Sequence, residues 1–326
     1  MKIVILGKGK IGKAVKYYLK KLNLNVKVGF FNTKKDIKDC DLLISALSGD
    51  AGELALELAL KYRKNLIDIA DLDYEFYLKN KNNIKKAEIL VIPFAGFSPG
   101  LVNFICGREV KNNNVKEIEI LAGSLSKEKD SFPFLWCFED LIEGHELKAT
   151  IIKNGKKIKK PAFSDYRKQK IEKINTETYL AEGLGSLVDN LKVKNMSYRI
   201  IRNIGFYELF KSLENQGLLD EKNIELTQRK LESRKQDNLT IGVIKIKTDK
   251  KEIIWKMKAF SKENELLNSM QKITAIFPAL LVKEILKGNI VQKGLIFSEQ
   301  LGRDKDLFNR ILKEVKKEIS ISYLNP

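Results

Sequence analysis

Three glycines near the start of the chain have a spacing that could bind a dinucleotide. They lie in the run Gly7-Lys8-Gly9-Lys10-Ile11-Gly12, which follows a short apolar segment and opens a helical pattern. In this arrangement the first glycine allows a tight turn, the second lets the backbone approach a pyrophosphate, and the third lets the helix pack against the strand. The free N–H groups at the helix start then face the phosphates. The pattern predicts a cofactor site made by Gly7, Lys8, Gly9, Lys10, Ile11 and Gly12; the alternative is a glycine-rich turn without a ligand.

The end of the second expected strand bears on the type of cofactor. NAD sites usually have an aspartate or glutamate there, which holds the ribose hydroxyls. This chain has Asn32, Thr33 and Lys34, followed by Lys35. The first two can form hydrogen bonds, and the lysines can meet a 2′-phosphate as charges, so NADP is favoured and NAD is possible. The alternative is that the lysines belong to a lysine-rich surface while Asp36 binds the ribose.

Small and acidic residues follow the next two expected strands. Ligands of open α/β sheets lie outside the carboxyl ends of the strands, so Ala46, Leu47 and Ser48 are predicted cofactor-binding residues. The end of the following strand is surrounded by Asp68, Asp71 and Asp73. Asp71 comes just past the strand and is therefore a candidate catalytic carboxylate. A helix cap is an open alternative for Asp71 and the favoured role for Asp73.

Two arginines, one histidine and one tryptophan stand out because their types are rare in this chain. Nine of the 60 basic residues are arginine, and His145 is the one histidine. A guanidinium binds a carboxylate through two parallel hydrogen bonds, so Arg202 and Arg199 are candidate substrate-binding residues. Imidazole titrates near neutral pH, which makes His145 a candidate catalytic residue or, alternatively, an exposed loop residue. Trp136 could wall the substrate pocket, although core packing is the commoner use of tryptophan.

An elbow of glycine and proline follows the fifth expected strand, with the sequence Gly96-Phe97-Ser98-Pro99-Gly100-Leu101-Val102-Asn103. It resembles the GxxPGLxN segment of the saccharopine dehydrogenase-like family, which includes saccharopine reductases, lysine 6-dehydrogenases and carboxynorspermidine dehydrogenases. Four later segments resemble family segments in the same order. Residues 136–143 are similar to WSPEGLIEEY, 181–187 to TDGLxSL, 199–206 to TLRYPGH, and 294–299 to GVxxPE. The resemblance therefore extends over nearly the whole chain.

This resemblance implies an oxidoreductase that transfers hydride between NAD(P) and a C–N bond of an amino-acid substrate. Phe97, Ser98 and Asn103 would then lie at the ligand edge of the sheet as substrate-binding residues. A homodimer is expected too, partly because an antiparallel sheet has edges that need covering. The chain departs from the family where the histidine of TLRYPGH is Phe206 and the proline of WSPEGLIEEY is Phe138. These departures concern the identity of the substrate more than the class of reaction.

Alternating apolar and helical patterns predict the sheet that must position these residues. Short apolar runs at 2–6, 26–31, 41–47, 65–70 and 88–94 are expected strands. Helical patterns cover 13–22, 53–62, 73–81 and 99–110. The order strand, helix, strand is typical of a Rossmann-type parallel sheet with right-handed crossovers. Residues 1–112 are therefore predicted to form a dinucleotide-binding domain.

The pattern changes after the asparagines at 112–114. A strand is expected at 116–122, a hairpin with an Asn-Gly turn at 149–159, and another hairpin with strands at 239–247 and 252–259. These elements indicate an inserted α+β substrate and dimerisation domain at 113–268, with a mostly antiparallel sheet. Helices are expected at 269–287 and 306–319, and the family resemblance implies that 269–326 returns to the Rossmann domain. The predicted fold class is α/β, with the α+β domain inserted.

Composition disfavours several other classes of protein. The net charge is +18, but 51 of the 60 basic residues are lysines spread through the chain, which favours a solvated surface over a nucleic-acid interface. Three separated cysteines and one histidine indicate no metal site and no disulfide framework, so the reducing cytoplasm is expected. The N-terminus does not fit a signal peptide, and no segment reaches the roughly 20 apolar residues of a membrane span. A nucleic-acid binder and a nonenzymatic dinucleotide-sensing regulator are the alternatives from other classes.

Overall fold

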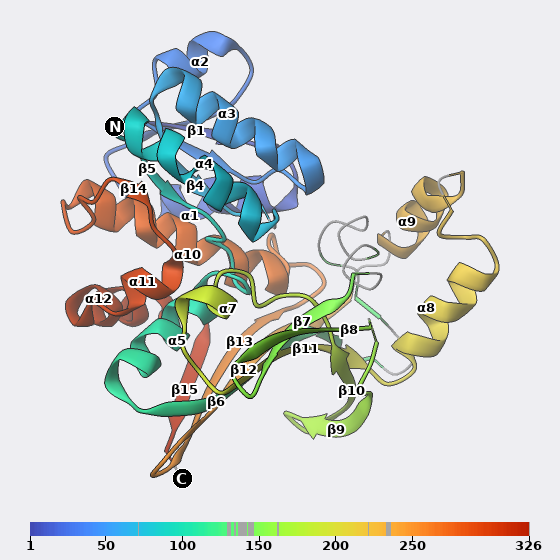
Figure 1. Cartoon of the computed structure of the whole chain (residues 1–326). Coiled ribbons are helices and arrows are strands. Elements are labelled where there is room, and N and C mark those ends of the chain that lie inside the picture. The colour runs from blue at the N-terminus through green and yellow to red at the C-terminus, as the bar shows by residue number, and fades with distance from the viewer. Residues whose placement is uncertain are drawn as a thin grey trace. The chain divides into compact units, whose positions relative to one another are not determined.

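The computed structural model describes residues 1–70, 72–128, 132–133, 135, 142, 147–161, 163–220, 222–232 and 236–325, except the side chains of 49, 50 and 232. The chain divides into two compact units, each made from several segments (Figure 1). The first unit comprises Met1–Asn114, Gly185–Lys192 and Lys272–Glu318. The second comprises Val115–Leu184, Val193–Gln271 and Ile319–Pro326.

The first unit is built around a sheet of six parallel strands in its described part. The strand order is β14-β5-β4-β3-β1-β2, and every pair is parallel. The strands are β1 (Lys2–Leu6), β2 (Lys27–Phe30), β3 (Leu42–Ser45), β4 (Asn65–Asp68), β5 (Leu90–Ile92) and β14 (Gly294–Leu295). All four residues of β3 are buried, as expected for a central strand covered on both faces. The predicted Rossmann-type sheet is confirmed.

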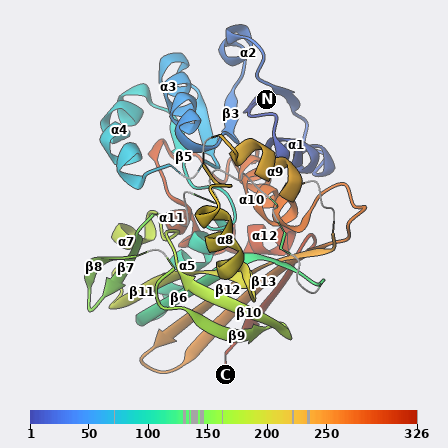
Figure 2. The ribbon, with the colours of Figure 1, turned by 90° about the vertical axis from the view of Figure 1, so that its right-hand side faces the viewer.

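Helices cover both faces of this sheet. Figure 2 shows α1 on one side and α3 and α4 on the other, as right-handed crossovers in opposite directions along a sheet require. The helices are α1 (Lys10–Lys21), α2 (Lys34–Lys38), α3 (Glu53–Tyr62), α4 (Tyr74–Ala87), α5 (Leu101–Asn112), α7 (Leu187–Asn190), α10 (Ser269–Leu286), α11 (Ser298–Gly302) and α12 (Lys305–Val315). Helix α4 continues six residues beyond the predicted end at 81, because Ile84 on its later turns is fully buried.

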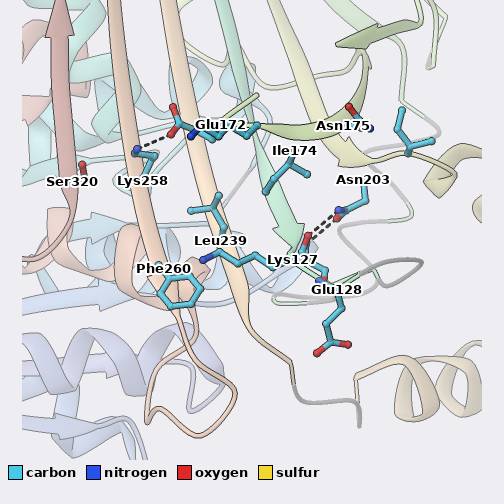
Figure 3. A pocket seen from close by; sticks show the side chains of 13 residues that line it. Lys127, Glu128, Glu172, Ile174, Asn175, Asn203, Leu239, Lys258, Phe260 and Ser320 are labelled. Atoms are coloured by element: carbon cyan, nitrogen blue, oxygen red, sulfur yellow. Dashed lines mark hydrogen bonds and ion pairs between the residues drawn. The ribbon is translucent and has the colours of Figure 1, made fainter. Parts of the chain in front are cut away.

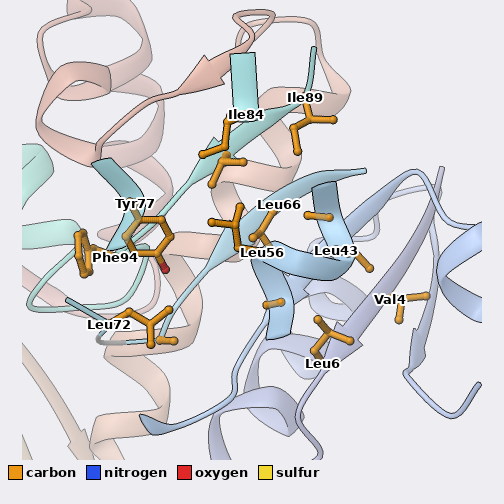
Figure 4. Packing of buried hydrophobic residues seen from close by; sticks show 14 of the residues in the cluster. Val4, Leu6, Leu43, Leu56, Leu66, Leu72, Tyr77, Ile84, Ile89 and Phe94 are labelled. Carbon is orange, nitrogen blue, oxygen red and sulfur yellow. The ribbon is translucent and has the colours of Figure 1, made fainter. Parts of the chain in front are cut away.

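The core of the first unit lies between the sheet and its helices. Figure 4 shows strand residues such as Val4, Leu43 and Leu66 packed with Leu56 of α3 and Tyr77 of α4. Tyr77 also packs edge to face against Phe94, with ring centroids 5.3 Å apart. Because Phe94 lies two residues before the predicted elbow, this core fixes the place where the elbow begins.

The second unit contains a mostly antiparallel sheet, as predicted. Its strand order is β15-β13-β12-β6-β11-β10-β9, and β7 and β8 form a hairpin beside β11. Of these pairs, β6 with β11 is parallel. The strands are β6 (Val115–Ser126), β7 (Ala149–Lys153), β8 (Lys156–Lys160), β9 (Arg167–Ile171), β10 (Ile174–Leu180), β11 (Asn195–Asn203), β12 (Asn238–Thr248), β13 (Glu252–Ser261) and β15 (Ser320–Leu324). Helices α8 (Phe206–Asn215) and α9 (Ile224–Glu232) follow β11.

The two faces of this sheet differ in chemistry. Ile120, Ile244 and Met257 are fully buried on one face. On the other face charged pairs surround a small apolar cluster, for example Lys245 with Glu119 at 3.0 Å. Strand β15 is not predicted from the sequence, because the basic helical pattern continues to 319 and the residues after it carry no clear strand signal. Among the described residues, no helix is long and apolar enough to cross a membrane.

Candidate functional site

The three glycines after β1 lie in the environments that a dinucleotide turn requires. Gly7 has φ +99, and a Cβ added there would collide with the carbonyl oxygen of Ala46. A Cβ on Gly12 would collide with the carbonyl oxygen of Gly7, so only glycine at this position lets α1 pack so closely on the turn. Gly9 is the N-cap of α1, and nothing lies within 4 Å of its added Cβ. Space for a phosphate therefore exists in front of Gly9, at the helix start.

The turn meets the end of β2 through one side-chain contact. Lys8 donates a hydrogen bond of 2.7 Å from Nζ to Oδ1 of Asn32. Asp36 accepts hydrogen bonds from the backbone N–H groups of Thr33, at 2.8 Å, and Asn32, at 3.1 Å. These two N–H groups lower the pKa of Asp36, which closes a capping box with Thr33, the N-cap of α2. The carboxylate that could have bound a ribose is thus engaged by its own loop.

Lys34 begins α2 and is exposed, as is Lys35. Neither lysine has an acidic partner among the residues that the structure describes. With Asn32 and Thr33 they form a loop that offers hydrogen-bonding groups and positive charge. Such a loop fits a phosphorylated ribose better than an unphosphorylated one.

The carboxyl ends of β3 and β4 carry a buried acid. Asp68, the last residue of β4, is fully buried. Its carboxylate accepts hydrogen bonds from the Tyr77 hydroxyl at 2.7 Å and from the N–H of Ala70 at 2.9 Å. Burial raises the pKa of Asp68 to about 6, although these hydrogen bonds act in the opposite direction. The sequence signal for this buried acid is an aspartate directly after Leu66 and Ile67 at the end of the strand. The position just past the strand favours Asp71 in the sequence analysis.

Ala46, Leu47 and Ser48 follow β3 directly. The N–H of Ala46 donates to the carbonyl of Leu6 at 2.8 Å, which ties this loop to the end of β1. The predicted cofactor residues from the glycine turn and from this loop are therefore neighbours. Asp73 caps α4 by accepting from the N–H of Glu75 at 3.1 Å, as the sequence pattern favoured.

The elbow before α5 is tightly folded and contains two buried polar groups. Gly100 has φ +136, and an added Cβ would collide with the carbonyl oxygen of Gly96. Asn103 accepts from the N–H of Gly100 at 3.2 Å through Oδ1. Its Nδ2 and the Ser98 hydroxyl are buried without a hydrogen-bond partner in the described part of the chain. Phe97, the residue before Ser98, is also buried. Buried polar groups of this kind need a ligand or water to satisfy them.

Arg202 lies in the second unit, on β11, and is 3% exposed. Its guanidinium carbon is 5.0 Å from the centroid of the Phe206 ring, and the side chain also interacts with Tyr179. Glu177 is opposite Arg202 in the β10–β11 register and accepts from the N–H of Tyr207 at 2.6 Å. Burial lowers the pKa of Arg202. A buried guanidinium held over an aromatic ring and hydrogen-bonded to a tyrosine side chain is preorganised to bind a planar anion.

Arg199 is three residues away on β11 but has a different environment. It donates to Oδ2 of Asp165 at 2.7 Å and also reaches the backbone oxygen of Asp165. Asp165 also forms an ion pair of 2.6 Å with Arg167. The guanidinium of Arg199 is therefore engaged by an acid of its own unit.

Three other predicted site residues, Asp71, Trp136 and His145, lie outside the described residues.

A hollow of about 810 Å³ lies on the charged face of the second unit (Figure 3). Lys258 forms an ion pair of 2.7 Å with Glu172 there, and Lys127 lies 4.0 Å from the centroid of the Phe260 ring. The remaining wall is partly apolar, from Ile174 and Leu239. None of the predicted site residues that the structure describes lines this hollow. Its lysines could attract a small anion, and no local sequence motif predicts this feature.

Comparisons with known proteins identify one matching family and several solved structures of similar fold. Residues 96–321 match the saccharopine dehydrogenase C-terminal domain, and no curated protein matches the sequence. Apo saccharopine dehydrogenase (L-Glu forming) from Saccharomyces cerevisiae has a similar fold, with a TM-score of 0.76 and 13% identity over 100% of this chain and 99% of that chain. DAP dehydrogenase from C. glutamicum in complex with DAP has a TM-score of 0.49 and 10% identity over 96% of this chain and 98% of that chain. Since the family match covers more than half of the sequence, the chain belongs to the family of the saccharopine dehydrogenase C-terminal domain.

Proposed function

We propose that the protein is an NADP-dependent oxidoreductase that transfers hydride at a C–N bond of an amino-acid substrate. Family membership supports the class of reaction, and the glycine turn after β1 is the observation that carries the proposal. In the oxidative direction an amine carbon loses hydride and becomes an imine; in the reductive direction an imine is reduced. When bound, the nicotinamide supplies the hydride chemistry. The protein supplies binding, orientation and charge.

The residues after β2 support NADP as the cofactor, with NAD as the alternative. Asn32 and Thr33 offer hydrogen bonds, Lys34 and Lys35 offer positive charge, and the Asp36 carboxylate is already engaged by the N–H groups of Asn32 and Thr33. Gly9 leaves room for the pyrophosphate at the start of α1. Ala46, Leu47 and Ser48 would line the path of the cofactor along the carboxyl ends of the strands.

Arg202 is proposed to bind a carboxylate of the substrate. It is a buried guanidinium beside Phe206 and Tyr179, and a carboxylate removed from water needs a fixed partner of opposite charge. Arg199 is not retained in this role because Asp165 already engages it. Phe97, Ser98, Asn103 and Trp136 remain proposed substrate-binding residues, and Asp71 and His145 remain proposed proton-transfer residues.

We also propose a cytoplasmic homodimer whose partners are otherwise small molecules. The two described cysteines, Cys40 and Cys106, are free and buried, which suits a reducing compartment. The net charge of +18 would attract anionic cofactors and amino acids with carboxylates.

A binding and turnover experiment tests the function. NADPH is titrated by its fluorescence, and NADP⁺ reduction is followed with a panel of amino acids that includes secondary amines such as saccharopine. NADPH binding with amino-acid-dependent reduction is the expected result. NADPH binding without turnover on any amino acid or imine would favour a nonenzymatic sensor, and no dinucleotide binding would exclude both proposals.

A further inference from the structure

The sheet of the second unit ends in three strands that each pair on one side only in the described structure: β8, β9 and β15. Free strand edges invite pairing with other chains, and proteins commonly block them with charged side chains, above all lysine. Strand β8 has the sequence KKIKK, with four lysines in five residues. Strand β9 has the sequence RKQKI, with three basic residues in five. Both edges are therefore protected against pairing.

Strand β15 is the exception. Its sequence is SISYL, without a charged residue, in a chain in which 31% of residues are charged. It pairs with β13 along its whole length, from Ser320 opposite Lys258 to Leu324 opposite Ile254. Its side chains are nevertheless open to solvent, with Tyr323 44% and Leu324 47% exposed. An uncharged, solvent-exposed edge strand lacks the usual protection.

We infer that the outer edge of β15 pairs antiparallel with β15 of a second copy of this chain. This inference rests on the homodimer proposed above and names its surface. Pairing of identical strands across a two-fold axis satisfies both free edges at once and closes the assembly at two copies. The two nine-stranded sheets would then continue into each other.

Charge favours a second copy at this edge and at neither of the others. Two chains of +18 repel each other, and pairing through β8 or β9 would bring lysines and arginines face to face. At β15 no such repulsion arises from the strand itself. The contact would also cover the exposed side chains of Tyr323 and Leu324. The Tyr323 ring is already fixed by Trp255, with ring centroids 4.8 Å apart.

The test is the mass of the full chain in solution, measured by light scattering after size exclusion. The wild type is expected at twice its 37.3 kDa. The variant Ser320→Lys/Ser322→Lys gives β15 the kind of protection that β8 and β9 have, and its dimer dissociation constant is expected to rise at least roughly tenfold. The matched control is Asn25→Lys/Gln292→Lys, which adds the same two charges at exposed positions of the first unit. It is expected to dimerise like the wild type.

Hydrogen–deuterium exchange gives a second readout that needs no variant. The peptide covering 320–324 should exchange more slowly at concentrations where the dimer forms than at dilution. A dimer without this protection, or one that both double variants weaken equally, would overturn the pairing through β15. A dimer that neither variant weakens would also overturn the pairing through β15, but the proposal of a homodimer would stand. A wild-type monomer would overturn both, and since none of these readouts depends on turnover, the proposed reaction is tested separately.

Discussion

The hydroxyl of Tyr77 donates a hydrogen bond of 2.7 Å to the carboxylate of Asp68, and both side chains are fully buried. The pair joins the end of β4 to helix α4, next to the end of β3. The main factors that act on the Asp68 carboxylate are its burial and the hydrogen bonds from Ala70 and Tyr77. Uncharged donors offset only part of the cost of burying a carboxylate, which is why the pKa of Asp68 rises to about 6. A group that titrates near neutrality thus lies at the edge of the sheet where the cofactor is proposed to bind.

This pKa makes a prediction for stability against pH. Because the pKa of Asp68 is raised from 3.8 to about 6 in the folded state, its protonated form favours folding below pH 4, and that contribution is lost as the pH rises through 6. The loss amounts to about 3 kcal/mol. Asp68→Asn removes the titration, so the stability of the variant relative to wild type should increase between pH 4.5 and pH 7.5. Urea unfolding at the two pH values measures the difference.

Tyr77→Phe is the matched control for this prediction. It removes one donor to the carboxylate, so it should increase the pH dependence of stability rather than abolish it. Equal stability differences between Asp68→Asn and wild type at both pH values would contradict the raised pKa.

Gly9→Asp separates cofactor binding from folding. Nothing lies within 4 Å of the added Cβ, and aspartate is a good N-cap, so the melting temperature should not fall. The carboxylate would stand where the pyrophosphate must bind, and NADPH affinity should fall by at least roughly a hundredfold because like charges then meet at short range. Fluorescence titration measures the affinity. Gly12→Ala is the contrasting variant: its Cβ collides with the carbonyl of Gly7, so stability should fall as well. Unchanged NADPH affinity in Gly9→Asp would contradict a pyrophosphate site at Gly9.

The choice between NADP and NAD is tested at the start of α2. Replacing Lys34 and Lys35 together by alanine removes two exposed cations from the proposed 2′-phosphate site. NADPH affinity should fall roughly tenfold while NADH affinity changes little, since NADH has no phosphate there. The control Lys85→Ala/Lys86→Ala removes two exposed cations from the last turn of α4. Equal losses of NADPH and NADH affinity would contradict a 2′-phosphate site at Lys34 and Lys35. The same loss in the control variant would show that the effect comes from general charge and not from this site.

The elements that local patterns specify could be predicted from the sequence. The glycine turn, the first five strands of the parallel sheet and the β12–β13 hairpin each depend on neighbours within a few residues, and all occur in the structure. The two-residue strand β14 is too short a pattern to predict. Long-range partners could not be predicted. The sequence makes Arg199 a candidate carboxylate-binding residue but does not show that Asp165, 34 residues earlier, accepts a hydrogen bond from it. Strand β15 was missed because five residues without charge or clear alternation become a strand only when β13 supplies the pairing edge.

Arg202 gives the sharpest test of substrate binding. If it holds a substrate carboxylate, its removal costs a charge-assisted pair of about 1.5–3 kcal/mol, so kcat/KM for the amino acid should fall by roughly ten- to a hundredfold. Arg202→Met is preferable to alanine because it keeps most of the buried volume beside Phe206. NADPH affinity should stay unchanged, since the glycine turn belongs to the first unit. Arg202→Lys should rescue poorly, because a point charge cannot replace the planar fork.

Arg199→Met is the matched control on the same strand. It breaks the ion pair with Asp165, so the melting temperature should fall while kcat/KM for the folded enzyme changes less than threefold, about 0.6 kcal/mol. The opposite pattern, full activity in Arg202→Met and a large loss of kcat/KM in Arg199→Met without unfolding, would transfer the carboxylate-binding role to Arg199. Because both residues lie on β11 and are nearly equally buried, general damage to the strand would affect the two variants alike. A difference between them would therefore report on substrate binding rather than on folding.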